Sequence, residues 1–365
     1  MKLALAHEFL TQWGGGEYVL KVFSEIWPDA PIHVIAYDSK IVNEFLPGRK
    51  IIPSFLQKFP GMPKRFKYYL SWMPGAVESF NFNGYDVVIS DASAFAKGII
   101  THSPTKHICY MHTPTRYLWS DRDSYIESAP IPLPFIGRGV VRSIIRKLQK
   151  WDLVASERPD YLIANSKFIA ARSERYYKRR PDAVIFPPVD CSRFKVTAPN
   201  DYFLVVGRQE PYKRTDIAIE AANMLGVKLK VVGGGTKINA LKEIAGPTIE
   251  FTGRVSDEEL VDLYSGCLAF LFPPIEDAGI TPLEAMASGR PVIAYGHGGA
   301  LESVVAGVTG EFFTEQTAES MAAAMKRFDV SNYDPQKIRA HAELFDKEVF
   351  KKKIVEIVVS VLASK

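Results

Sequence analysis

The chain has 365 residues, which is long for one hydrophobic core and sufficient for two domains. Apolar residues make up 47% of it and the mean hydropathy is near zero, so the composition is that of a soluble globular protein without a membrane-spanning segment. Residues 1–195 hold 27 Lys and Arg against 18 Asp and Glu, and residues 196–365 hold 18 against 23, so a first part of charge +9 precedes a second of −5.

The N-terminal stretch MKLALAHEFL is interrupted too early by His7 and Glu8 to be a signal peptide. Three scattered cysteines, without metal-ligand spacing, indicate reduced thiols in a cytosolic protein and argue against a zinc site. The sequence therefore predicts a cytoplasmic protein, with peripheral attachment to the inner face of the cytoplasmic membrane as an open alternative.

The first predicted elements are a strand at 3–6, a glycine-rich loop at 13–17 and a helix over 18–27. Glycines allow backbone amides to approach a ligand closely. Val19 stands where the third glycine of a dinucleotide fingerprint would be, which disfavours a dinucleotide cofactor. A tight turn without a ligand is an equal alternative.

Strands are predicted at 32–36 and 86–90. The same half of the chain contains two basic, apolar-rich segments, at 57–73 and 137–151. Basic amphipathic helices can lie in an anionic membrane surface. The alternative is ordinary surface helices packed on their own domain. No nucleic-acid-binding motif accompanies the charge.

A strand at 106–110 carries His112 just past its C-terminal end, the edge at which open α/β sheets bind ligands. His7 is expected in a similar place after the first strand. Both histidines are therefore candidates for function.

Further strands are predicted at 161–165 and 183–188, followed by a proline-containing linker up to 201. A second series then alternates strands at 202–207, 229–233 and 249–253 with helices over 215–225 and from Ser256, which Glu259 caps. The alternation predicts an α/β protein with two Rossmann-like parallel-sheet domains, 1–196 and 197–345, and a C-terminal helix in 346–365.

The loop and helix after the apolar run 267–272 contain the densest group of candidate residues. Thr281, Pro282 and Glu284 fit the N-cap, N1 and N3 positions of a helix with a capping box. Capping does not account for Glu276, although a solvated surface charge remains its alternative reading. Arg208 and Lys213, just past a strand end, suit a diphosphate, and a helix N-terminus adds amides for an anion.

Four motifs of the chain resemble those of the retaining nucleotide-sugar glycosyltransferases of family four. They are Gly207-Arg208 with Lys213, the pair Glu276 and Glu284, the 111–114 turn and the 14–17 loop. The resemblance spans residues 3 to about 313. It implies the GT-B fold, with an N-terminal acceptor-binding domain facing a C-terminal donor-binding domain across a cleft, and a last helix that crosses back to the first domain.

The resemblance also implies roles for individual residues. The donor diphosphate would contact Arg208 and Lys213, and the ribose and sugar hydroxyls would contact Glu284 and Glu276. His112 would lie near the donor sugar. Further donor contacts would come from Gly15, Gly16, Gly253, Val255, Asp277, Ala278, Gly279, Ile280, Thr281 and Leu283.

Two departures from the family stand out: Ala278, where many relatives have phenylalanine, and Pro282, which has no amide. No metal site and no cofactor are expected, because the two cations and the helix dipole can stabilise the leaving diphosphate. The letters of Asp121-Arg-Asp123 match a metal-binding motif but stand apart from those cations. Retention would then proceed by front-face attack of the acceptor hydroxyl.

The 112–119 turn and the 276–284 motif look most like bacterial mannosyltransferases of surface-polysaccharide assembly that use GDP-mannose. The expected partners are a nucleotide sugar, a glycan or polyprenyl-diphosphate-linked acceptor and an anionic membrane surface, and no nucleic acid. The alternatives are a UDP-sugar-dependent glycosyltransferase, a nucleotide-sugar epimerase of the same architecture and a non-catalytic membrane-bound nucleotide-sugar binder.

Overall fold

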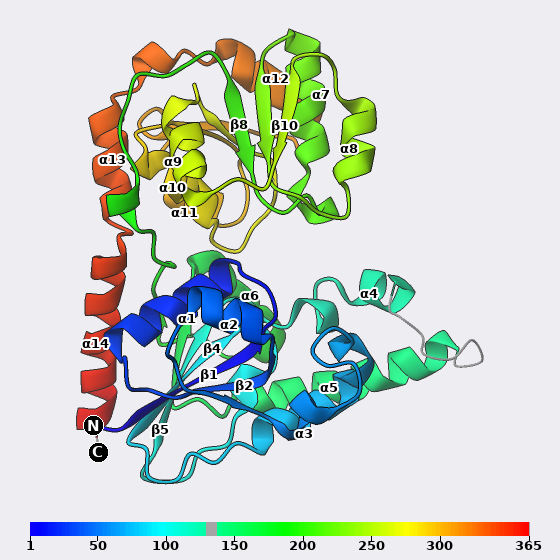
Figure 1. Cartoon of the computed structure of the whole chain (residues 1–365), viewed down its shortest axis with the longest axis vertical. Helices are drawn as coiled ribbons and strands as arrows, with labels where there is room; N and C mark the ends of the chain where they lie inside the picture. Colours follow the sequence, from blue (N-terminus) through cyan, green and yellow to red (C-terminus); the bar gives the residue numbers. More distant parts are fainter. Residues whose placement is uncertain (129–136, 365) are drawn as a thin grey trace. The chain divides into compact units, whose positions relative to one another are not determined.

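The structure, a computed structural model that describes residues 1–128 and 137–364, divides into two units (Figure 1). Unit 1 comprises Met1–Phe186 together with the chain from Lys351 on, and unit 2 comprises Pro187–Phe350. Each unit is built on its own parallel sheet with helices around it, as the alternating pattern predicts.

In the described residues, unit 1 has a seven-stranded sheet in the order β3-β2-β1-β4-β5-β6-β7, with every pairing parallel. Its strands are β1 Leu3–Leu10, β2 Ile32–Tyr37, β3 Ile51–Pro53, β4 Val87–Ala92, β5 Lys106–Met111, β6 Tyr161–Ala164 and β7 Ala183–Val184. The chain leaves β1 for β2 on one side and later adds β4 on the other. The strand order therefore reverses between β1 and β4.

The helices of unit 1 are α1 Gly15–Ile26, α2 Ser39–Phe45, α3 Met73–Glu78, α4 Arg122–Ser128, α5 Arg138–Ser156, α6 Lys167–Tyr177 and most of α14 Lys347–Ala363. Two predictions need correction here. His7 lies inside β1, because the strand continues to Leu10. Gly15 and Gly16 form the first turn of α1 rather than a loop, since extended Gly14 is its N-cap.

The two basic segments of unit 1 cover one hydrophobic cluster. Residues 55–72 form two 3-10 turns, Phe55–Lys58 and Phe66–Trp72, and their inward aromatic rings pack on the same buried cluster as Ile145 and Leu148 of α5. The basic side chains of these segments face outward. The exposed ones include Lys58, Lys64, Arg65, Lys67, Arg142, Arg146, Lys147 and Lys150. The apolar side of α5 is thus packed on its own unit.

Among the described residues, unit 2 has a six-stranded parallel sheet in the order β10-β9-β8-β11-β12-β13. Its strands are β8 Phe203–Val206, β9 Leu229–Val232, β10 Ile249–Gly253, β11 Phe270–Phe272, β12 Val292–Tyr295 and β13 Gly310–Phe313. Its helices are α7 Thr215–Leu225, α8 Ile238–Ile244, α9 Asp257–Gly266, α10 Ile280–Ala287, α11 Ala300–Ser303, α12 Ala318–Arg327 and α13 Pro335–Glu343. Here the strand order reverses between β8 and β11.

The predicted linker packs on unit 2. Val189 forms a parallel bridge with Asp346, and the backbone N–H of Cys191 donates to Asp346 Oδ2 at 3.1 Å. The division into units therefore falls after Phe186 and after Phe350, and not at residues 196 and 345.

No helix in the described ranges, 1–128 and 137–364, is long and apolar enough to cross a membrane. The three cysteines, Cys109, Cys191 and Cys267, are buried free thiols, as the sequence predicts. Burial raises the pKa of each to about 12.

Candidate functional site

Both sheets place several of the predicted site residues near the point where the strand order reverses. In open α/β sheets, ligands bind outside the carboxyl ends of the strands at that point, because the two connections diverge and leave room. In unit 2 the segments that follow β8 and β11 carry Arg208, Lys213 and Glu276. In unit 1, His112 follows β5, the strand next to β4, and lies beside Gly16 of α1, the helix that follows β1.

The cations and carboxylates of unit 2 are brought together. Lys213 Nζ forms an ion pair with Glu276 Oε1, and each side chain is 17% exposed. Arg208 is exposed, and both cations line a small cavity with Gly207, Pro273 and the first residues after β11. This part of unit 2 therefore places two cations beside a carboxylate, and cations of this kind suit an anion.

The helix after Glu276 begins differently from the prediction. Gly279, with φ of +77°, is the N-cap of α10, and no side chain caps the helix. Thr281 is thus inside the first turn rather than at the cap, and the predicted capping box is absent. Pro282 falls in the same turn, where an amide has no partner within the helix. With Gly279 as N-cap, the amides of Ile280 and Thr281 have no carbonyl partner within the helix, whereas the amide of Leu283 faces the Gly279 carbonyl. The helix start is thus uncapped, of the kind that binds phosphate.

Glu284 is not a capping residue either, because its carboxylate binds another side chain. The hydroxyl of Tyr264, on α9, donates to Glu284 Oε2 at 2.7 Å. Burial raises the pKa of Glu284, and the hydrogen bond from Tyr264 partly counteracts that effect. Tyr264 was not predicted, since nothing in the residue pattern links it to a carboxylate twenty positions away.

Glycines behind the 275–279 loop were also missed. The backbone N–H of Gly299 donates to the carbonyl of Glu276 at 2.9 Å, and a Cβ at Gly299 would lie 2.7 Å from the Asp277 carbonyl oxygen. Ala278 is buried against this glycine. The pair Gly298-Gly299 after β12 was the available signal. Gly253 and Val255 lie apart from this loop, at the end of β10, and are partly exposed.

In unit 1, His112 belongs to a buried polar cluster. Its Nε2 lies 2.6 Å from Oδ1 of Asp91, whose Oδ2 lies 2.9 Å from Nδ1 of His7. Gly16 packs beside the His112 ring, so that a Cβ there would lie 3.6 Å from Nε2. Gly15, one residue earlier, is exposed. Asp91 was not predicted, although a polar residue at the end of the apolar run in β4 was a usable signal.

Asp91 determines the charge of this cluster. Burial would lower the pKa of both histidines, but contact with the Asp91 carboxylate raises the pKa of His7 to about 9 and also raises that of His112. Burial would raise the pKa of Asp91, but the charge of His112 holds it below its ordinary value. At neutral pH the Asp91 carboxylate is therefore charged and lies beside the imidazolium ring of His7.

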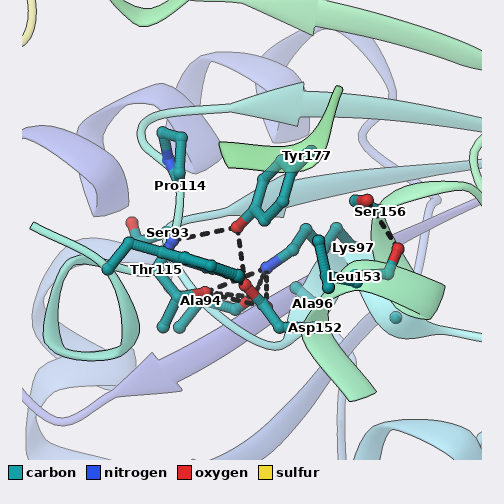
Figure 2. A network of polar contacts seen from close by, with 12 residues as sticks. Ser93, Ala94, Ala96, Lys97, Pro114, Thr115, Asp152, Leu153, Ser156 and Tyr177 are labelled. Atoms are coloured by element: carbon teal, nitrogen blue, oxygen red, sulfur yellow. Dashed lines mark hydrogen bonds and ion pairs between the residues drawn. The ribbon is translucent and has the colours of Figure 1, made fainter. Parts of the chain in front are cut away.

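A second buried network holds the loop that follows His112 (Figure 2). Asp152 of α5 accepts hydrogen bonds from Lys97 Nζ at 2.5 Å and Thr115 Oγ1 at 3.0 Å, and its Oδ2 accepts from Trp119 and Tyr177 at 2.7 Å each. Burial opposes the charge of Lys97, yet Asp152 raises its pKa above the ordinary value. These contacts fix the 113–119 loop to α5 and α6.

Within the described part of the chain, no three His, Cys, Asp or Glu residues are grouped as metal ligands would be. Asp121 and Asp123 are ion-paired with Arg116 and Arg122 at 3.0 and 2.8 Å. The two aspartates therefore have arginine partners on the surface.

Comparison with solved structures identifies the fold. Sucrose-phosphate synthase from Thermosynechococcus elongatus has a TM-score of 0.76 at 18% identity, with all of each chain covered. Anabaena HepE, in complex with UDP and glucose, has a TM-score of 0.73 at 18% identity over 99% of this chain and all of the other. The two parallel-sheet units have the GT-B fold of glycosyltransferases.

The chain matches, over residues 192–343, the family model described as Glycosyl transferases group 1. It is 25% identical over 285 residues to human alpha-1,3/1,6-mannosyltransferase ALG2, covering 67% of this chain and 64% of the relative. It is 28% identical over 153 residues to the O-antigen chain mannosyltransferase C of Escherichia coli, covering 37% of this chain and 41% of that one. The matches span only half to two thirds of the first curated relatives, human and mouse ALG2.

Proposed function

We propose that the protein transfers mannose from GDP-mannose to a hydroxyl of a lipid-linked or oligosaccharide acceptor in surface-polysaccharide biosynthesis. The observation that carries the proposal is the grouping in unit 2 of Arg208 and Lys213 with Glu276 and the uncapped start of α10. Two cations and a helix N-terminus suit a diphosphate, and carboxylates suit hydroxyls. Relatives named as mannosyltransferases support mannose as the sugar.

In the proposed reaction, Arg208, Lys213 and the first-turn amides of α10 stabilise the negative charge that develops on the leaving diphosphate. Glu284, held by Tyr264, binds the ribose hydroxyls, and Glu276 binds a hydroxyl of the sugar. His112 contributes to the transfer step from unit 1. The acceptor hydroxyl attacks from the same face, so that the configuration at the anomeric carbon is retained.

We propose that no metal takes part, since the fixed cations can supply the required charge. Transfer should then be unchanged by EDTA and by added Mg²⁺ or Mn²⁺. Stimulation by either metal would contradict this part of the proposal. NMR of the initial product distinguishes retention from inversion directly.

The donor is tested by thermal shift and calorimetry with GDP, GDP-mannose, UDP and UDP-glucose, on the unaltered protein, Glu284→Ala and a control, Glu220→Ala. Glu220 is an exposed glutamate of α7. We expect stabilisation by the GDP compounds that Glu284→Ala loses and Glu220→Ala keeps. No response to any nucleotide would overturn the proposal.

A preference for UDP would replace the mannose assignment by the second candidate, a UDP-sugar-dependent transferase. The structures that favour it are those of Anabaena HepE, which are described as complexes with UDP and with UDP-glucose. The fold and the diphosphate contacts would be the same for either donor.

A lipid-linked acceptor is supported by the outer surface of the basic segments. Phe55, Tyr68 and Trp72 are 41%, 49% and 55% exposed among the exposed lysines and arginines of residues 58–67 and α5. Aromatic and basic side chains together favour an anionic membrane surface. We expect binding to phosphatidylserine vesicles that falls steeply with salt, and no binding at low salt would contradict it.

A further inference from the structure

The cluster at the strand-order reversal of unit 1 contains more than the predicted histidine. One carboxylate, Asp91, lies between two imidazole rings, with oxygen-to-nitrogen distances of 2.9 Å to His7 and 2.6 Å to His112. The side chains of His7 and Asp91 are 5% and 1% exposed, whereas that of His112 is 13% exposed. Only one end of the chain of three side chains therefore approaches the surface.

The strand pairing sets this geometry. His7 of β1 stands directly beside Asp91 of β4 in the parallel register, and His112 begins the segment that leaves β5, the next strand. The same nitrogen, His7 Nδ1, lies 3.2 Å from the Asp91 backbone carbonyl oxygen, and Asp91 Oδ2 has no hydrogen-bond partner in the described residues, so the contact between His7 and Oδ2 is an ion pair. Because the contact with Asp91 occupies Nε2 of His112, that ring can turn only Nδ1 toward a ligand.

The remaining charged groups near His7 are already engaged or lie on other elements. The Glu8 carboxylate accepts hydrogen bonds from the backbone N–H groups of Ser93, Ala94 and Ala96 at 2.8 to 3.2 Å. The titratable groups that face His7 and its partners are Glu8 of β1, Glu17 of α1, Asp91 of β4, Tyr110 of β5 and His112. Asp91 is the one that contacts both rings.

We propose that His7, acting through Asp91, is a positioning residue that fixes the orientation and the charge of the His112 ring during sugar transfer. This inference rests on the proposed function, in which His112 contributes to the transfer step. A buried carboxylate with a single imidazole partner would suffice for packing. The second ring supplies a positive charge that balances Asp91 and thereby controls how strongly Asp91 holds the proton of His112.

The test follows the titration of the His112 ring by NMR, together with the pH profile of transfer. His7→Asn keeps a polar donor near the position of Nδ1 but removes the positive charge, so His112 should titrate about one pH unit higher. Asp91→Asn removes the negative charge, so His112 should titrate about 1–3 units lower. The limb of the pH profile of transfer that reports His112 should move to higher pH in His7→Asn and to lower pH in Asp91→Asn.

A matched control is His107→Gln. His107 is buried in β5 of the same sheet, and its Nε2 lies 2.7 Å from Ser90 Oγ rather than beside a carboxylate. Its replacement should lower stability yet leave the titration of His112 unchanged. A merely structural role for His7 would give His7→Asn the same behaviour, and that result would overturn the inference.

If Asp91→Asn does not fold, His7→Asn alone decides, since it retains the carboxylate. GDP binding is measured in parallel and should be equal in all variants, because the cations, the carboxylates and the helix start proposed to bind the nucleotide belong to unit 2. Absence of GDP binding in the unaltered protein would overturn the proposed function. The NMR titration would still decide whether His7 and Asp91 set the charge of His112.

Discussion

The polar groups beside the two strand-order reversals of this molecule differ between unit 1 and unit 2. In unit 1 the ionisable groups beside the reversal contact one another: Asp91 lies between His7 and His112, with one oxygen 2.6 Å from His112 and the other, which has no hydrogen-bond partner in the described residues, 2.9 Å from His7. In unit 2 the helix start at Gly279 has no side-chain cap, the Thr281 hydroxyl is buried without a hydrogen-bond partner in the described structure, and Arg208 is exposed. Contacts within unit 1 thus hold the His112 ring, whereas the start of α10 in unit 2 offers polar groups that a ligand can satisfy.

The largest effect should come from breaking the buried network of unit 1. Asp152→Asn keeps the shape of the side chain but leaves the Lys97 ammonium buried without its counter-charge. Breaking one partner of a buried ion pair costs about 3–5 kcal/mol, so we expect a loss of that order in the free energy of unfolding. Urea denaturation measures it.

The double variant Lys97→Met with Asp152→Leu is the matched control, because it removes both charges. It should cost clearly less than the single change, since no uncompensated charge remains buried. Equal losses in the single and double variants would mean that packing, and not charge, holds the 113–119 loop.

In unit 2 the corresponding change should affect function and not folding. Arg208→Ala removes an exposed side chain that we propose to stabilise the leaving diphosphate. Loss of one such group lowers the rate of transfer by about 10²–10³-fold. Arg327→Ala, at an exposed arginine of α12, should leave the rate unchanged. A rate that Arg208→Ala does not alter would remove this residue from the proposed site.

How far the sequence predicts each unit also differs. The alternation of strands and helices predicts two parallel-sheet domains but not the strands β3, β12 and β13, and the capping box of Ser256 and Glu259 is confirmed. The same pattern at Thr281 and Glu284 gives a wrong helix start, because Gly279 adopts a left-handed conformation and begins α10 earlier. A capping motif reports only local preference, and the backbone path through Gly279 overrides it.

The partners of the site residues could not be predicted, because they come from elements far apart in the chain. Asp91 reaches His7 across a strand pairing and His112 across the next one. Tyr264 reaches Glu284 from another helix. Strand ends indicate which residues gather at one edge of a sheet, but only the register between strands decides which side chains touch.

The charge within the unit 1 cluster predicts how stability depends on pH. The pKa of His7 is about 9 in the folded protein against an ordinary 6.5, so the folded state binds the proton more tightly. The contribution is complete below pH 6.5 and is lost as pH rises through 9, an effect on the order of 3 kcal/mol. Urea denaturation between pH 6 and 9.5 should show this decline, and His7→Asn should flatten it. An equal decline in both proteins would assign it to other groups.

The smallest expected effect distinguishes the start of α9 from the start of α10 in unit 2. The Ser256 hydroxyl accepts from the Glu259 backbone N–H at 3.2 Å, and the Glu259 carboxylate accepts from the Ser256 N–H at 2.8 Å. Ser256→Ala should therefore cost about 1 kcal/mol in the free energy of unfolding. Nucleotide affinity should not change, because α9 is closed by its own side chains whereas α10 is open to a ligand. A fall in GDP affinity in Ser256→Ala, measured by calorimetry, would mean that the start of α9 belongs to the nucleotide site as well.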